Sequence, residues 1–196
     1  DGWRAIIAKD YTVYNVARVS KALADWLKQS NPTPKVVVGH DCRFGGPMFT
    51  ETVADVLCAN GVKVIMAQGY ISTPMLSFGV LKLSADQGVV ITASHNPPAD
   101  NGYKVYDRQA SQIVSPMDVA IQEAIDAAPG AAQIPRHESA FEGASPLVSL
   151  RDRIDFMPMV LTATCIRWSA TESYSIFLRS RRAATGGTRT LPQASS

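Results

Sequence analysis

The sequence has 196 residues, of which 46% are hydrophobic and 18% charged, and its formal net charge is +2. This length suits one ordinary domain or one domain with an additional segment, and the hydrophobic fraction excludes a chain that is disordered throughout. No stretch approaches the roughly 18 apolar residues that a membrane-spanning helix needs, so we expect no membrane partner.

The basic residues and the cysteines narrow the class of protein further. All lysines lie at or before Lys104, so the basic character of the C-terminal part comes from arginine alone. Few aromatic residues interleave with these arginines, which argues against a nucleic-acid partner. Cys42, Cys58 and Cys165 have no metal-ligand spacing and are typical of reduced thiols. We therefore expect a cytoplasmic protein.

Hydrophobic periodicity predicts an alternation of helices and strands in the first half of the chain. In chain order we expect a helix over 13–30, a strand over 36–38, a helix between Gly45 and Gly61, a strand over 62–66, a helix over 74–83 and a strand over 88–92. Strand–helix–strand units at this spacing are typical of parallel sheets. The predicted fold class is therefore α/β, a three-layer sandwich with a mostly parallel sheet between helices.

The pattern changes after the third strand. Residues 103–106 and 112–114 have the composition of a hairpin, and a helix is expected from Pro116 to about Ala128. Beyond Arg136 no period is sustained, and the last residues have little to bury. We therefore expect a domain over residues 1–136 and a degenerate, poorly structured tail over 137–196.

The most informative segment follows the strand over 88–92. It reads Thr-Ala-Ser-His-Asn-Pro over residues 92–97, and the chain returns as Asn-Gly-Tyr-Lys-Val-Tyr over residues 101–106. Right-handed crossovers place the loops at Asp41, Thr73 and Ser94 on one rim of the sheet, where ligands of α/β proteins bind. Such a loop, with a hydroxyl and cationic side chains within reach, is suited to handling phosphate.

Each candidate residue has a chemical interpretation and a structural one. Ser94 is the expected nucleophile, although an isolated serine in such a turn would more often cap the backbone. His95 could donate to a phosphate oxygen or brace the loop. Lys104 could help to move a hydroxyl proton, and Arg4 could bind a phosphoryl group bidentately. A final group, Asp41, Arg43 and Asn96, is interpreted as support for the rim.

These segments resemble the signature of the α-D-phosphohexomutases, the family of phosphoglucomutases and phosphomannomutases. The resemblance extends to Gly-His-Asp-Cys-Arg over residues 39–43, Ser-Thr-Pro over 72–74 and the opening Asp-Gly-Trp-Arg. It implies the N-terminal, phosphoserine-bearing domain of an isomerase that moves a phosphoryl group within a hexose phosphate. By this resemblance Ser94 carries the phosphoryl group, Lys104 and Arg4 flank it, and a glucose or mannose 1,6-bisphosphate serves as activator and intermediate.

The resemblance also implies Mg²⁺ as cofactor, held by an oxygen of phosphorylated Ser94 and by the aspartates of an Asp-Gly-Asp-x-Asp-Arg loop. No Asp-x-Asp occurs in this sequence, so only the phosphate ligand is expected from these residues. An alternative is therefore an inactive truncated fragment that binds sugar phosphates weakly at most. A third interpretation, a basic interaction module, depends only on the C-terminal arginines, and salt-sensitive nucleic-acid binding would favour it.

Overall fold

The computed structural model describes residues 2–137 and 148–152. Its helices are α1 (Val13–Ser30), α2 (Gly46–Ala59), α3 (Thr73–Lys82) and α4 (Met117–Ala127), followed by a short 3-10 helix (Ala131–Gln133). Its strands are β1 (Trp3–Ile6), β2 (Lys35–His40), β3 (Lys63–Tyr70), β4 (Gln87–Ile91), β5 (Asp100–Tyr106) and β6 (Val148–Asp152). The helices and strands alternate as the sequence predicts.

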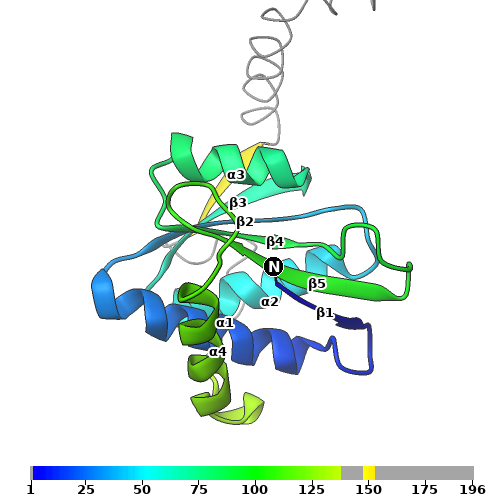
Figure 1. The fold of residues 1–196 in the computed structure, drawn as a ribbon, viewed down its shortest axis with the longest axis horizontal. Helices are drawn as coiled ribbons and strands as arrows, with labels where there is room; N and C mark the ends of the chain where they lie inside the picture. Colours follow the sequence, from blue (N-terminus) through cyan, green and yellow to red (C-terminus); the bar gives the residue numbers. More distant parts are fainter. Residues whose placement is uncertain (1, 138–147, 153–196) are drawn as a thin grey trace, which may run out of the picture. The chain divides into compact units, whose positions relative to one another are not determined.

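The strands form one sheet in the order β1-β5-β4-β2-β3-β6, with helices on both faces (Figure 1). Helix α3 covers one face, and α1, α2 and α4 cover the other. Strands β4, β2, β3 and β6 are parallel, whereas β5 is antiparallel to both β4 and β1. The predicted three-layer α/β sandwich with a mostly parallel sheet is therefore confirmed.

Local sequence explains where the first helix begins and which face it buries. The side chain of Thr12 accepts a hydrogen bond from the Asn15 amide at 3.2 Å and so caps α1. One stripe of α1 packs into the core, at Val16, Val19, Leu23 and Leu27. In the part of the chain that the structure describes, no helix has both the length and the apolarity to cross a membrane.

The central strands form the inside of the sandwich. Val36, Val37 and Val38 of β2 have no exposed surface, because helices cover both faces of the sheet. Gly88 of β4 lies under α3, where an added Cβ would come within 2.6 Å of Val80 Cγ2. The close packing of α3 on this face depends on the absence of a side chain there.

The segment after the site differs from its prediction. Strand β5 begins at Asp100, and its partners are β1 and β4 rather than a following strand. The predicted hairpin is reduced to a single bridge between Tyr106 and Gln112. β5 is stabilised by pairing with the preceding strand β4 and with β1, which is distant in sequence. The local pattern of residues 103–114 contains neither partner.

Strand β6 lies inside the segment that the sequence assigns to the irregular tail. It pairs in parallel with β3, with Val148 opposite Val64 and Asp152 opposite Gln68. The sheet therefore includes residues beyond 136, and the domain boundary itself stays a prediction. Main-chain hydrogen bonds to an edge strand can order a short segment that has no periodic pattern of its own. The other residues of the predicted tail, 138–147 and 153–196, lie outside the described residues.

Candidate functional site

The loops that follow the parallel strands meet at one rim of the sheet, as predicted. The Asp41 amide, directly after β2, donates to the Ile91 carbonyl at the end of β4 at 3.2 Å. The Ile71 amide, directly after β3, donates to the His40 carbonyl at 2.9 Å. These bonds bring the loops at residues 41, 72 and 94 together at the carboxyl ends of the strands, the usual position of ligand sites in such folds.

Ser94 is exposed, and its backbone has a left-handed conformation with φ 57°. This conformation costs an L-residue roughly 1–2 kcal/mol, so the surrounding bonds must maintain it. The amide of Ser94 donates to Thr92 Oγ1 at 3.0 Å, and its carbonyl accepts from Arg43 Nη2 at 2.9 Å. The hydroxyl of Ser94 is thus presented to solvent on a backbone that is held on both sides.

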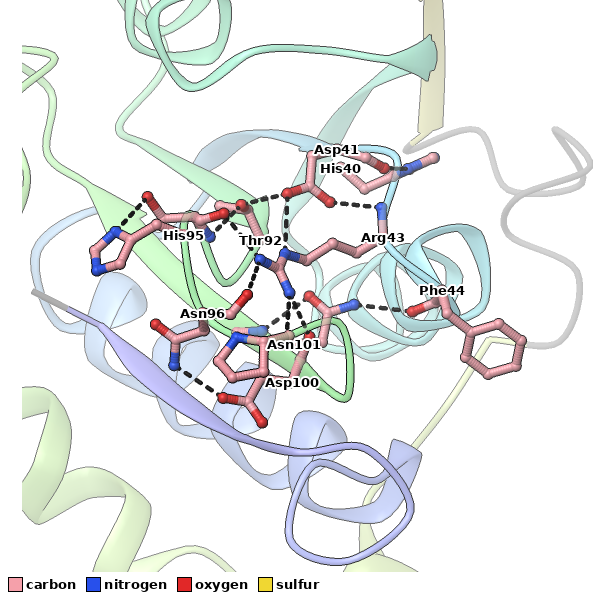
Figure 2. A network of polar contacts seen from close by, with 12 residues as sticks. His40, Asp41, Arg43, Phe44, Thr92, His95, Asn96, Asp100 and Asn101 are labelled. Atoms are coloured by element: carbon pink, nitrogen blue, oxygen red, sulfur yellow. Dashed lines mark hydrogen bonds and ion pairs between the residues drawn. The ribbon is translucent and has the colours of Figure 1, made fainter.

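Arg43 holds the loop that carries Ser94 (Figure 2). Its Nη2 donates to the carbonyls of Ser94 and Asn96 at 2.9 and 2.6 Å, and its Nη1 donates to those of Pro97 and Asp100 at 2.8 and 3.0 Å. The side chain is only 13% exposed. Its terminal nitrogens are therefore occupied by the backbone, which makes Arg43 a support of the loop rather than a ligand for substrate.

Asp41 lies between Arg43 and Thr92, as Figure 2 shows. Its Oδ2 is 3.8 Å from Arg43 Nε, so the two side chains form an ion pair. Its Oδ1 accepts the Arg43 amide at 2.9 Å, and its Oδ2 accepts the Thr92 hydroxyl at 2.5 Å. Asn96 closes the loop by donating from Nδ2 to Asp100 Oδ2 at 2.9 Å. These contacts link the end of β2 to the loop after β4.

His95 follows Ser94 and is also exposed. Its Nδ1 lies 3.4 Å from Ser94 Oγ, and this is the one polar contact of its ring within the described residues. Among residues 2–137 and 148–152 the imidazole makes no hydrogen bond to the backbone, and both roles open from the sequence stay predictions. The imidazole is instead placed next to the hydroxyl, where it could exchange a hydrogen bond with the hydroxyl or with a group bound to it.

Lys104 and Arg4 lie on neighbouring strands at the base of this loop. Lys104 on β5 is only 7% exposed, and Arg4 on β1 is opposite Gly102. Burial, and to a smaller extent the charge of Arg4, lowers the pKa of Lys104 below its ordinary value. The Thr92 amide donates to the Gly102 carbonyl at 2.9 Å, which ties this strand pair to the loop of Ser94. A buried amine of lowered pKa is suited to proton transfer.

Two supporting residues were not singled out from the sequence. Thr92 joins Asp41 to the Ser94 amide, and a threonine two residues before a turn serine is a recognisable local signal for such a bond. Asn101 is fully buried; its Nδ2 donates to the Phe44 carbonyl at 3.1 Å and its Oδ1 accepts the Gly102 amide at 2.8 Å. The local sequence does not predict the bond from Asn101 to Phe44, because these two residues are far apart in the sequence.

The described residues do not form a metal site. No group of three or more His, Cys, Asp or Glu side chains that could hold an ion occurs among residues 2–137 and 148–152. The carboxylates of the loop network, Asp41 and Asp100, already accept bonds from Thr92, Arg43 and Asn96. Mg²⁺ requires several oxygen ligands in octahedral geometry, so these residues by themselves do not fit it.

Comparison with known proteins connects this geometry to a family. A family model described as phosphoglucomutase/phosphomannomutase, alpha/beta/alpha domain I, matches residues 1–130. A probable phosphomannomutase of Haemophilus influenzae is 37% identical over 129 residues, which cover 63% of this chain and 27% of that protein. A phosphoribomutase of Saccharomyces cerevisiae is 44% identical over 116 residues, which cover 57% of this chain and 19% of that protein.

Solved structures resemble the chain in the same way. A putative phosphomannomutase of Thermus thermophilus superposes with a TM-score of 0.68 at 30% identity, covering 78% of this chain and 32% of that chain. The chain therefore spans between 19% and 32% of the length of these three proteins.

Proposed function

Because the chain belongs to the phosphoglucomutase/phosphomannomutase family and matches its α/β/α domain I, we propose that it is the phosphoserine-bearing domain of a hexose-phosphate mutase. The observation that carries this proposal is the exposed Ser94, held in a left-handed backbone conformation at the sheet rim with an imidazole nitrogen 3.4 Å from its hydroxyl. An enzyme that moves a phosphoryl group between two positions of one sugar requires an accessible acceptor of this kind.

The reaction consists of two transfers through Ser94. In the first, the bond between phosphorus and Ser94 Oγ breaks, and a bond forms between phosphorus and a hydroxyl oxygen of the sugar phosphate. The product of this step is a sugar bisphosphate, and the proton of the sugar hydroxyl leaves to a base. In the second, the other phosphoryl group returns to Ser94 Oγ, and the released sugar oxygen regains a proton. Both transfers need cationic groups around the phosphoryl oxygens.

The candidate side chains have complementary roles in this scheme. Lys104, whose pKa is lowered chiefly by burial, takes and returns the proton of the sugar hydroxyl. Arg4 binds phosphoryl oxygens through its planar, permanently charged guanidinium. His95 donates a hydrogen bond to an oxygen of the phosphoryl group on Ser94. Asp41, Arg43 and Asn96 hold the loop and do not touch substrate.

The proposed substrate is a hexose phosphate, with glucose or mannose 1,6-bisphosphate as intermediate. The relatives are named as mutases of mannose, ribose and glucose phosphates, which supports a sugar phosphate as the substrate class. Mg²⁺ is the proposed cofactor because it neutralises phosphoryl oxygens in such transfers. The phosphate on Ser94 would supply one ligand, and carboxylates beyond the described residues would have to supply the rest.

The experiment is to incubate the protein with ³²P-labelled glucose 1,6-bisphosphate and Mg²⁺ and to map the label by mass spectrometry. We expect label on Ser94, and none after Ser94→Ala. Ser84→Ala is a matched control, because Ser84 is another exposed serine with positive φ, at 48°, but it lies at the end of α3. Label that persists in Ser94→Ala, or that is absent from the unaltered protein, contradicts the proposal.

A second candidate is that these 196 residues alone bind sugar phosphates weakly and do not turn them over. It is supported by the small share of each relative that the chain covers. Mutase turnover by the chain alone tests this second candidate. We expect no mutase turnover above background. The labelling of Ser94 is a separate measurement, and it tests the phosphoserine assignment whether or not turnover occurs. Clear turnover by the isolated chain would remove the second candidate.

A further inference from the structure

The hydroxyl of Thr92 is part of a hydrogen-bonded chain whose direction is determined by its ends. Thr92 Oγ1 lies 2.5 Å from Asp41 Oδ2 and 3.0 Å from the Ser94 amide nitrogen. An ionised carboxylate only accepts and a backbone amide only donates. The single hydroxyl proton of Thr92 therefore goes to Asp41, and a lone pair of the same oxygen receives the Ser94 N–H. A side chain without a hydroxyl cannot serve both neighbours.

The opposite side of Ser94 is held by Arg43. Arg43 Nη2 donates to the Ser94 carbonyl at 2.9 Å and to the Asn96 carbonyl at 2.6 Å. The other terminal nitrogen donates to the Pro97 and Asp100 carbonyls. The four N–H groups of the two terminal nitrogens match four carbonyls, and Nε faces Asp41. A lysine has only three donors on one nitrogen and cannot reproduce this pattern.

Both peptide groups that flank the Ser94 Cα are thus held by side chains from elsewhere in the rim. Two peptide planes together determine φ and ψ, and these angles determine the direction of the Cα–Cβ bond. The left-handed φ of 57° at Ser94 is an unfavourable conformation that would relax without such restraints. Asp41 anchors both restraints, because it accepts from Thr92 and pairs with Arg43.

We infer that Thr92 and Arg43 are positioning residues that aim the Ser94 hydroxyl, acting through its amide and its carbonyl and not through charge at the phosphoryl group. This inference rests on the proposed function for the role of Ser94 as phosphoryl acceptor, but the restraint on its backbone does not. Retaining the charge while losing the pattern of donors, as in Arg43→Lys, should therefore impair the loop. Retaining the hydroxyl while losing the methyl group, as in Thr92→Ser, should not.

The first measurement is amide hydrogen exchange and the Cα and Cβ chemical shifts of Ser94 in the ¹⁵N,¹³C-labelled full chain. In Thr92→Val we expect the Ser94 amide to exchange about five- to tenfold faster, a change that corresponds to the loss of one hydrogen bond. In Thr92→Ser we expect its exchange rate to stay within about twofold of that of the unaltered protein. Arg43→Lys should shift the Ser94 Cα and Cβ signals. Thr33→Val and Arg108→Lys, on exposed side chains away from the rim, are the controls.

The second measurement is the rate of labelling from ³²P-labelled glucose 1,6-bisphosphate. For Thr92→Val we expect the maximal rate to fall about five- to tenfold with the half-saturating concentration unchanged, because buried Thr92 acts through the Ser94 amide and not by binding the sugar phosphate. Ser94 exchange and shifts that are equal in Thr92→Val, Arg43→Lys and the unaltered protein would overturn the inference. Failure of the unaltered protein to label Ser94 would instead overturn the proposed function, and the exchange data would still decide the inference.

Discussion

Arg4 and Lys104 lie on the same face of the antiparallel pair β1–β5, because Arg4 is opposite Gly102 and Lys104 lies two residues further along β5. Val90 of β4 is opposite Lys104, so the lysine lies between β1 and β4 and only 7% of it is exposed. The proximity of a second cation adds to the desolvation of the amine, and both disfavour its charged form, which lowers the pKa of Lys104.

The first prediction concerns the titration of Lys104. Arg4→Met should raise the pKa of Lys104 toward its ordinary value of 10.5 but not restore it, because burial is the larger cause of the shift. NMR titration of the lysine ¹³Cε signal measures this, with Arg108→Met as the control. Because the pKa of Lys104 is lower in the folded than in the unfolded protein, protonated Lys104 reduces the free energy of unfolding at neutral pH. This loss of stability is recovered as the pH rises from the pKa of the folded state to that of the unfolded state. An unchanged or lower pKa in Arg4→Met contradicts this account.

The second prediction concerns alkaline unfolding. Burial raises the pKa of Tyr11 and of Tyr103 above the ordinary value of 10.0, and Tyr103 shares a hydrogen bond with Ser20 at 3.3 Å. Since the folded state favours the protonated phenols, stability should fall as the pH rises above about 10. We expect these two tyrosines to ionise together with the loss of circular dichroism. Tyr103→Phe should reduce the absorbance change of that step, and ionisation of both phenols in the folded protein would refute the prediction.

The third prediction compares two glycines. An added Cβ at Gly102 would lie 2.5 Å from the Thr92 carbonyl oxygen and 3.0 Å from that of Trp3, both parts of the backbone. Gly102→Ala should therefore lower the free energy of unfolding by about 1–3 kcal/mol. Gly130→Ala is the matched control, since nothing lies within 4 Å of its added Cβ and the change should be neutral or slightly stabilising. Urea unfolding measures both, and equal effects would contradict the prediction.

The fourth prediction separates stability from chemistry at Ser94. Ser94→Gly removes a conformational strain of about 1 kcal/mol, because glycine adopts the left-handed backbone without a steric penalty. It also increases the conformational entropy of the unfolded chain, which destabilises the folded state by a similar amount. The free energy of unfolding should therefore change by no more than about 1 kcal/mol. Labelling from the bisphosphate should disappear completely. Ala110→Gly, at φ 64°, provides the comparison for the backbone effect alone. A loss of stability well above that of Ala110→Gly would show that the Ser94 side chain supports the fold.

The layered fold was predictable because its helices and central strands carry local signals. The Thr12 cap, the continuous valines of β2 and the glycine before α2 each appear where the structure has an element boundary or a buried strand. Strand β1 has only four residues with mixed exposure, and β6 has no periodic context. Each of these two strands is stabilised by pairing with a strand that is distant in sequence. A prediction from neighbouring residues alone cannot include that partner.

The candidate site was predictable in its residues but not in its connections. The loop of Ser94 and the pair of Asp41 and Arg43 could be named from the sequence, because strand ends and family motifs mark them. The sharing of one guanidinium among four carbonyls could not, because residues 43 and 94 are far apart along the chain and meet only when β2 and β4 pair. The roles of Ser94, His95, Lys104 and Arg4 in phosphoryl transfer stay predictions.

The pairing of β1 with β5 also sets the order of events during synthesis. The partner strand of Arg4, residues 100–106, leaves the ribosome almost a hundred residues after Arg4 does. At about 5–20 residues per second, the opening segment must wait on the order of 5–20 s before it can close this edge of the sheet. Arg4, the proposed phosphate-binding cation, therefore cannot take its place in the sheet until the strand that bears Lys104 has been made.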